Sequence, residues 1–354
     1  MKKTKNKAAV WAAALVLLLP VLGCSGSKSD QNKLYIYNWT YYTPDSVIKQ
    51  FEQEYGVTVI YDEFASNEDM YAKIKAGGSG YDIVFPSQDF VSIMISQNMF
   101  EQIDKSKLSN LENVDPAVLQ KATYDPTMEY SVPYYFGAAG IAVNTARVPD
   151  FEQSWSIFAR TDLAGRMTML DDMREVMGDA LKFLGYSVNT KNPAEINAAR
   201  DLINNKWKPN LVKFDAEAFG KGYADGEFWV VQGYPEVVFE EIGDNEQLRN
   251  NTVFFIPPEG GPSYIDSMCI LKGSKHIDLA YKFIDFIHRP EIYAEFCDYF
   301  GFPATVNIPA RQYKKGVSHY EAGELARTEL KYDLGETLEL YNAAWFDTIR
   351  IGGD

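Results

Sequence analysis

The sequence predicts an α/β protein with two lobes, each a mixed, mostly parallel sheet flanked by helices. Three observations support this prediction. About 330 residues remain after an N-terminal leader, which is more than one core holds comfortably. Strand and helix patterns alternate in short succession near the start of the chain. A second set of such patterns begins after residue 144.

The N-terminus has the features of an export signal that ends in a lipidation site. Four lysines precede an apolar run from about Ala8 to Leu22, which is short for a membrane-spanning helix. Residues 1–23 are therefore expected to be a signal peptide. The segment that ends in Cys24 resembles the bacterial lipobox, so we expect a lipid on Cys24 and a flexible tether over residues 24–32. The alternative is a plain signal peptide followed by a chance cysteine.

Charge and composition restrict the partners of the mature chain. Loss of residues 1–23 removes four lysines and no acidic residue, so the net charge changes from −15 to −19. Such an acidic surface argues against nucleic acid as a partner. Cys269 and Cys297 lie in apolar or aromatic surroundings and are expected to be buried thiols. The three histidines show no metal-ligand spacing, so neither a metal nor a cofactor is expected.

The first set of elements follows directly from the periodicity. An alternating strand leads into an aromatic loop, and apolar residues at helical spacing continue until Gly56. A strand, a helix, a glycine-rich turn and another strand follow, which predicts parallel βαβ units with ligand-binding loops at the carboxyl ends of the strands. The expected strands are 34–38, 57–61 and 81–85, and the expected helices are about 44–55 and 67–76.

The second set begins with a long apolar segment, residues 134–144, that is expected to pass from one lobe into the other. A return strand is expected at 263–270, and Pro290 is expected to end an amphipathic helix at 277–288. The remaining expected elements are a helix that starts at 170–175, helices near 193–204 and 217–223, a strand at 228–231 and a last helix at about 334–350.

Three groups of residues are candidates for binding a ligand. Three rings, Trp39, Tyr41 and Tyr42, fall at one strand-to-helix junction, where aromatic faces attract cations and aliphatic ligands or simply pack under the loop. Asp172 and Glu175 share one face of an expected helix, which favours a cation. Capping of the helix start by Asp171 or Asp172 is the competing interpretation.

The third candidate is Asp266, which lies inside an apolar strand. A buried charge without a partner is costly, so Asp266 requires one. A cationic ligand, Lys272, Lys275 or a backbone amide would each serve.

Five segments in this order make the chain resemble the bacterial spermidine/putrescine-binding proteins, the PotD-type receptors of ABC transporters. They are Asn38–Tyr42, Tyr71–Lys75, Tyr81–Ser87, Asp171–Val176 and Asp266–Ser267. The resemblance implies a periplasmic binding protein fold that closes on a polyamine in the interlobe cleft and delivers it to an ABC permease. It implies a first lobe of residues 33–136 with 267–302, and a second of residues 137–266 with 303–354.

The resemblance also implies which residues line the cleft. Those that match the family's pattern are Trp39, Thr40, Tyr42, Ser87, Asp172, Glu175, Tyr264 and Asp266. Those that depart from it are Asp89, Gln232, Phe302 and Lys331, with Tyr41 in place of a common Glu. Lys331 in the cleft would repel a third ammonium and Asp89 would act oppositely, so spermidine and putrescine both stay open.

Two other functions are kept as alternatives. One is a secreted hydrolase that uses Asp172, Glu175 or Asp266 as acid and base, although no activated nucleophile accompanies them. The other is the same fold with a different ligand, such as ferric iron bound by clustered tyrosines.

Overall fold

The structure is a computed structural model that describes residues 32–40, 42–77 and 80–350. The expected signal peptide, Cys24, nearly all of the tether and Tyr41 lie outside the described residues. Within these ranges, no helix combines the length and the apolar character that are needed to cross a membrane.

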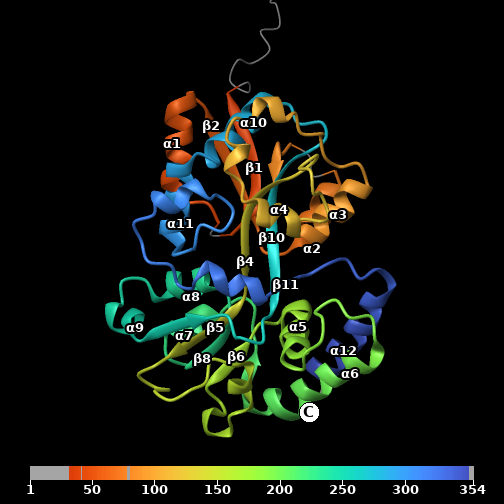
Figure 1. Ribbon diagram of the computed structural model, residues 1–354, viewed down its shortest axis with the longest axis vertical. Coiled ribbons are helices and arrows are strands. Elements are labelled where there is room, and N and C mark those ends of the chain that lie inside the picture. Colours follow the sequence, from red (N-terminus) through yellow and green to blue (C-terminus); the bar gives the residue numbers. More distant parts are fainter. Residues whose placement is uncertain (1–31, 41, 78–79, 351–354) are drawn as a thin grey trace, which may run out of the picture.

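The first lobe is built on a mixed sheet at the upper end of the molecule (Figure 1). Its strands are β1 (Lys33–Trp39), β2 (Thr58–Phe64), β3 (Ile83–Val84), β4 (Val132–Ala138), β10 (Pro262–Ile270) and β11 (Glu329–Leu330). The order is β11-β10-β3-β1-β2, and β4 also pairs with β10. β1 is parallel to β2 and β3, which confirms the predicted βαβ units.

The second lobe contains a five-stranded sheet in the order β7-β6-β8-β5-β9. Its strands are β5 (Gly140–Asn144), β6 (Met167–Met169), β7 (Leu211–Phe214), β8 (Val230–Gly233) and β9 (Thr252–Phe255). β6 is parallel to both of its neighbours, whereas β5 is antiparallel to β8 and β9. This sheet is therefore also mixed.

Helices flank both sheets (Figure 1). Those of the first lobe are α1 (Asp45–Tyr55), α2 (Asn67–Lys75), α3 (Gln88–Ser96), α4 (Pro116–Lys121), α10 (Ile277–Ile287) and α11 (Pro290–Phe300). Those of the second lobe are α5 (Met173–Phe183), α6 (Pro193–Leu202), α7 (Phe219–Ala224), α8 (Pro235–Ile242), α9 (Glu246–Asn250) and α12 (Leu338–Arg350). Pro290 follows a helix, as expected, and it also begins α11. A proline fits the first turn of a helix because the N–H that it lacks has no partner there.

The predicted passage between lobes is confirmed at residues 134–144. β4 ends in the first sheet at Ala138, and β5 begins in the second sheet at Gly140. The return strand β10 pairs with β4 along its first part and with β3 at its end. These strands run through the middle of the molecule in Figure 1 and place the residues of β10 beside both lobes.

The assignment of residues 303–354 to the second lobe remains a prediction. The early part of this segment bonds to the first lobe, since the N–H of Asp115 donates to the carbonyl of Val306 (2.7 Å). α12, at its end, packs on α5 and α6 of the second lobe.

Apolar packing continues from the first lobe across the junction. One buried cluster joins Phe51 and Phe296 of the first lobe to Phe219 and Val238 of the second. Cys269 and Cys297 are both free and buried, as expected. The two lobes therefore share one buried apolar cluster.

Candidate functional site

Asp266 lies at the centre of the junction, on β10. It is only 4% exposed, and both of its carboxylate oxygens accept hydrogen bonds from hydroxyl groups. Tyr42 Oη donates to Oδ2 (2.7 Å) and Ser87 Oγ donates to Oδ1 (2.6 Å). The hydrogen bonds to the Asp266 carboxylate therefore come neither from Lys272 or Lys275 nor from a backbone amide. Lys272 bonds to Asn98 instead.

The two hydroxyl donors come from the carboxyl ends of neighbouring parallel strands. Tyr42 follows β1, and Tyr134 Oη donates to its carbonyl oxygen (2.6 Å). Ser87 follows β3 and precedes α3, and its N–H donates to Asn67 Oδ1 (3.2 Å). The loops at this edge of the sheet thus hold a buried acid, as the parallel topology predicts.

Burial raises the pKa of Asp266 to about 7, although the hydrogen bonds from Ser87 and Tyr42 lower it. Hydroxyl partners stabilise a carboxylate only in part, because they carry no opposite charge. A cation at this position would lower the pKa of Asp266 and take the place of solvent. The site is therefore chemically suited to a cationic ligand.

A second acid, Glu236, faces Asp266 from the first turn of α8. Burial and, to a smaller extent, the nearby charge of Asp266 raise the pKa of Glu236 to about 8. Its Oε2 has no hydrogen-bond partner within the described ranges. No local pattern selects Glu236, because an acid in the first turn of a helix is common.

Tyrosine rings surround these two acids. The ring centroids of Tyr234 and Tyr264 lie 5.9 Å apart, and those of Tyr135 and Tyr264 lie 6.5 Å apart. Gly137 makes room for Tyr264, since a Cβ at this glycine would lie 2.6 Å from the Tyr264 hydroxyl oxygen. Burial raises the pKa values of Tyr42 and Tyr264, so both phenols stay neutral.

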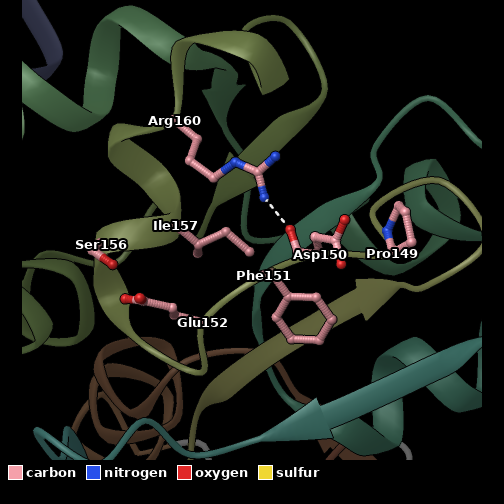
Figure 2. A pocket seen from close by; sticks show the side chains of 7 residues that line it. All are labelled: Pro149, Asp150, Phe151, Glu152, Ser156, Ile157 and Arg160. Carbon is pink, nitrogen blue, oxygen red and sulfur yellow. Dashed lines mark hydrogen bonds between the residues drawn. The ribbon is translucent and has the colours of Figure 1, made fainter.

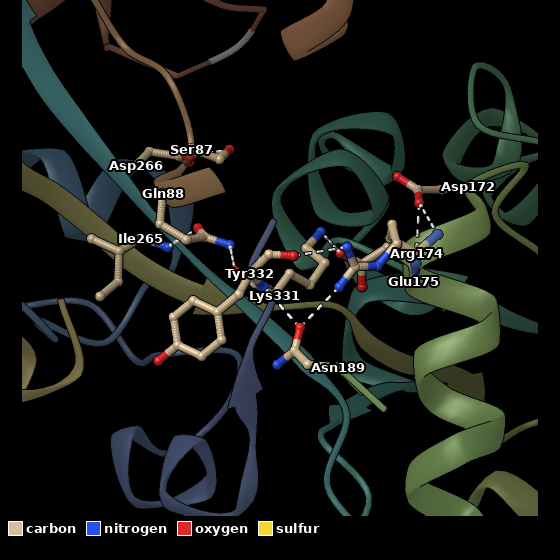
Figure 3. Close-up of polar contacts among 10 residues, drawn as sticks. All are labelled: Ser87, Gln88, Asp172, Arg174, Glu175, Asn189, Ile265, Asp266, Lys331 and Tyr332. Carbon is tan, nitrogen blue, oxygen red and sulfur yellow. Dashed lines mark hydrogen bonds and ion pairs between the residues drawn. The ribbon is translucent and has the colours of Figure 1, made fainter. Parts of the chain in front are cut away.

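Asp172 and Glu175 form a second acidic group at the start of α5, shown in Figure 3. Asp172 Oδ1 accepts from the N–H groups of Arg174 (2.8 Å) and Glu175 (3.0 Å), so the capping interpretation is correct for Asp172. Glu175 has no exposed surface, and its Oε1 accepts from Lys331 Nζ. Its Oε2 has no hydrogen-bond partner among the described residues.

Lys331 follows β11, and only 12% of its side chain is exposed. Burial alone would lower its pKa, but the charges of Glu175, Asp172 and Asp89 raise it. Lys331 therefore remains an ammonium group. Asp89, at the start of α3, takes part through its charge rather than through a direct bond to the ammonium.

The backbone around Lys331 is held by both lobes (Figure 3). Gln88 Nε2 donates to the Lys331 carbonyl (2.8 Å), while Gln88 Oε1 accepts from the N–H of Ile265 (2.9 Å). On the other side, Asn189 Oδ1 accepts from the N–H of Tyr332 (2.8 Å). Gln88 and Asn189 were not selected from the sequence, because their partners lie far away along the chain.

Two further polar residues lie beneath Glu175. Gln232 is fully buried, and its Oε1 accepts from the N–H of Leu170 (2.8 Å), which fixes the approach to α5. Asp179 lies one turn after Glu175, and neither of its carboxylate oxygens has a hydrogen-bond partner in the part of the chain that the structure describes. Burial and the charge of Glu175 raise the pKa of Asp179 well above its usual value.

The remaining predicted site residues that the structure describes are Trp39, Thr40 and Phe302. Trp39 is half-buried and donates from Nε1 to the carbonyl of Phe85 (2.8 Å), and Thr40 is exposed. Phe302 is fully buried and stacks on Tyr135 with ring centroids 4.1 Å apart. Contact of these three residues with a ligand remains a prediction.

Two cavities lie away from this junction. One, shown in Figure 2, has a volume of about 560 Å³ and lies on the second lobe beside Phe151, where Arg160 donates to the carbonyl of Asp150 (2.6 Å). The other, of about 740 Å³, lies on the first lobe near Tyr35 and His276. Within the described ranges, no group of three or more His, Cys, Asp or Glu side chains is arranged to hold a metal ion.

The chain has two lobes, strands that cross between them and a polar site at their junction. This arrangement is that of a solute-binding protein. Residues 46–318 match the model of the family described as bacterial extracellular solute-binding protein. The chain belongs to this family, within its PotD-type branch.

Three relatives illustrate this membership. The spermidine/putrescine-binding periplasmic protein of Salmonella typhimurium is 36% identical over 94% of this chain and 95% of its own length. The putrescine/cadaverine-binding protein of Pseudomonas aeruginosa is 33% identical over 77% of this chain and 79% of its own length. The crystal structure of the TpPotD lipoprotein of Treponema pallidum is 52% identical and has a TM-score of 0.86, covering 90% of this chain and 99% of that one.

Proposed function

We propose that this protein is an extracytoplasmic receptor that binds a polyamine between its lobes and delivers it to an ABC permease by lobe closure. The observation that carries the proposal is Asp266, a buried carboxylate with a raised pKa whose only bonded partners in the described chain are two hydroxyl groups. Glu236 and the tyrosine rings complete its surroundings. The names of the relatives support a polyamine as the ligand.

A polyamine fits this chemistry because it alternates charges with methylene groups. An ammonium placed against Asp266 would form a charge-assisted hydrogen bond. At an effective dielectric constant of 20, its Coulomb attraction at 4 Å is about 4 kcal/mol before desolvation. The methylene groups would pack on the faces of Tyr264 and Tyr234. Asp172, half-exposed at the start of α5, would receive a second ammonium.

The alternatives are less well supported. Ferric iron would require phenolate ligands, whereas Tyr42 Oη donates its proton in a hydrogen bond to Asp266. For a hydrolase, Asp172 caps a helix, Glu175 is paired with Lys331, and both carboxylate oxygens of Asp266 accept hydrogen bonds from Tyr42 and Ser87, none of which is arranged as an activated nucleophile. The relatives are named as binding proteins. We therefore infer a receptor that does not catalyse a reaction.

Titration calorimetry of residues 25–354 tests the proposal. Putrescine and spermidine are the test ligands, and free lysine, a neutral sugar and ferric iron are the controls. We expect saturable binding of at least one polyamine at a single site, with the ligand recovered unchanged. Binding of iron or a sugar in preference to both polyamines, or conversion of the ligand, would reject the proposal.

We also propose that a lipid on Cys24 anchors the receptor to the membrane. The Cys24→Ala variant should bind polyamine as the wild type does, because only the acyl chains depend on this residue. Detergent partitioning should move the variant from the detergent phase to the aqueous phase. Unchanged partitioning would mean that Cys24 is not the anchor.

A further inference from the structure

We propose that the ammonium group of Lys331 permanently occupies one ammonium subsite of the polyamine site, so that the protein selects diamines over triamines. This inference rests on the proposed function and specifies its ligand. The observation behind it is the ion pair between Lys331 Nζ and Glu175 Oε1 at the junction of the lobes.

The first step of the argument concerns Glu175. This carboxylate has no exposed surface, so its charge requires a cation beside it. A ligand ammonium would satisfy this requirement in a receptor for longer polyamines. Here the chain supplies the cation itself. A ligand gains nothing by bringing a further ammonium to Glu175.

The second step is that the backbone from which the Lys331 side chain projects is fixed. Its N–H donates to the Ser263 carbonyl (3.2 Å), and its carbonyl accepts from Gln88 Nε2 (2.8 Å). The next residue, Tyr332, is bonded to Asn189 and to Arg174 Nη1 (3.0 Å). Figure 3 shows the Lys331 side chain directed toward Glu175 from this fixed backbone.

The third step concerns the carboxylates that are left to pair with a ligand once Glu175 is paired with Lys331. The charge of Asp266 acts on Glu236, and the charge of Asp172 acts on the Lys331 ammonium. We place one ammonium group of the ligand at Asp266 and Glu236 and a second at Asp172. Asp89 adds negative charge near Lys331, but its effect is to hold the lysine in its charged form.

A third ammonium would meet Lys331 rather than a free carboxylate. Like charges a few ångströms apart in partly screened surroundings should weaken binding by about tenfold or more. This repulsion acts on triamines and not on diamines, so it changes the ratio of their affinities. The relatives do not decide the question, because their names include both spermidine/putrescine-binding and putrescine/cadaverine-binding proteins.

Calorimetric titrations with putrescine, cadaverine and spermidine test the inference on four forms of residues 25–354. The wild type should bind a diamine at least about tenfold more tightly than spermidine. Lys331→Gln should raise the affinity for spermidine by about tenfold or more and change that for putrescine by only a few-fold. Lys331→Arg, which keeps the charge, and Lys182→Gln, which removes a lysine paired with Glu329 outside the site, should both keep the wild-type ratio.

Three results would overturn the inference. They are equal or tighter binding of spermidine by the wild type, an unchanged ratio in Lys331→Gln, and the same gain for spermidine in Lys182→Gln. A thermal unfolding curve verifies the fold of each variant, and the wild-type ratio alone tests the inference if Lys331→Gln does not fold. Failure of the wild type to bind any amine would instead reject the proposed function.

Discussion

Asp266 combines burial, a raised pKa and uncharged partners, and this combination distinguishes it from the structural acids of the protein. Asp125, for comparison, is equally buried, but it accepts the N–H groups of Glu129, Tyr130 and Ser131. Those bonds complete a turn. The hydroxyl partners of Asp266 instead position a carboxylate that has no direct ion pair among the described residues, although the charge of Lys331 acts on it from a distance.

The substitution Asp266→Asn should weaken polyamine binding by about one to three orders of magnitude. Loss of one partner of a desolvated charge pair usually costs about 2–5 kcal/mol. Stability should change little, since Asn still accepts one of the hydroxyl bonds. Calorimetry gives the affinity, and thermal unfolding gives the stability.

Asp125→Asn is the matched control. It should lower the melting temperature, because it weakens bonds to buried backbone groups, and leave the affinity within a few-fold of the wild type. The account of Asp266 fails if Asp266→Asn lowers the melting temperature without weakening binding while Asp125→Asn weakens binding.

Glu175 has a different role, which a stability measurement should reveal. Glu175→Gln leaves the Lys331 ammonium in a buried position without its carboxylate partner. We expect a loss of about 3 kcal/mol in the free energy of unfolding, measured with urea, the lower end for a broken buried pair. The double variant Glu175→Gln/Lys331→Met should regain most of this loss. A double variant no more stable than Glu175→Gln would show that the two residues are not coupled.

At the scale of elements, the start of α5 combines a structural and a binding role in Asp172. The residue caps the helix through Oδ1, and it also places a negative charge beside the site. Asn is as good an N-cap as Asp, but it lacks the charge. The two roles can therefore be separated.

Asp172→Asn should keep the stability within a few tenths of a kcal/mol and weaken the binding of a diamine by about tenfold, as expected for a half-exposed charge. Asp172→Ala should weaken binding similarly and also cost about 1 kcal/mol of stability through the lost cap. Urea unfolding and calorimetry on both variants check this prediction. Wild-type affinity in Asp172→Asn would limit Asp172 to capping.

The elements of the fold were largely predictable because their signals are local. Alternation predicted β1, the return strand β10 was also expected, and the apolar length of residues 134–144 predicted the passage from β4 to β5. Pro290 was interpreted only as the end of the preceding helix. Because a proline also fits the first turn of a following helix, α11 was missed.

The site was less predictable because its contacts are distant along the chain. The position of Asp266 inside an apolar strand and the resemblance to a family both selected this residue. Its bonds to Tyr42 and Ser87 became visible only through the pairing of β10 with the first lobe. Glu236 and Asp179 have no local signal that distinguishes them from ordinary helical acids. Their burial is a property of the folded molecule.

At the scale of the whole molecule, the raised pKa values of Asp266 and Glu236 couple binding to pH. Burial raises them to about 7 and about 8. Ammonium groups pair with the ionised acids, so binding should release protons near neutral pH. The affinity should then fall as the pH decreases below about 8, by up to about tenfold per unit for each acid. Titrations from pH 6 to pH 9 in two buffers of different ionisation enthalpy measure both effects.

The same groups determine the sign of a stability change. Both acids hold their protons more tightly in the folded protein than in the unfolded chain, so the ligand-free protein should lose stability as the pH rises from about 4.5 to about 8. Asp266→Asn should remove part of this loss. An affinity that does not vary with pH would mean that neither acid meets the ligand's charge.

The central claim is that a polyamine ammonium pairs with Asp266 at the junction of the lobes. A crystal structure of residues 25–354 grown with putrescine tests it most directly. We predict one terminal nitrogen within about 3 Å of an Asp266 carboxylate oxygen, the methylene chain against Tyr264, and Lys331 still paired with Glu175. Putrescine bound elsewhere, or bound at the junction with its nitrogens away from Asp266, would contradict the account.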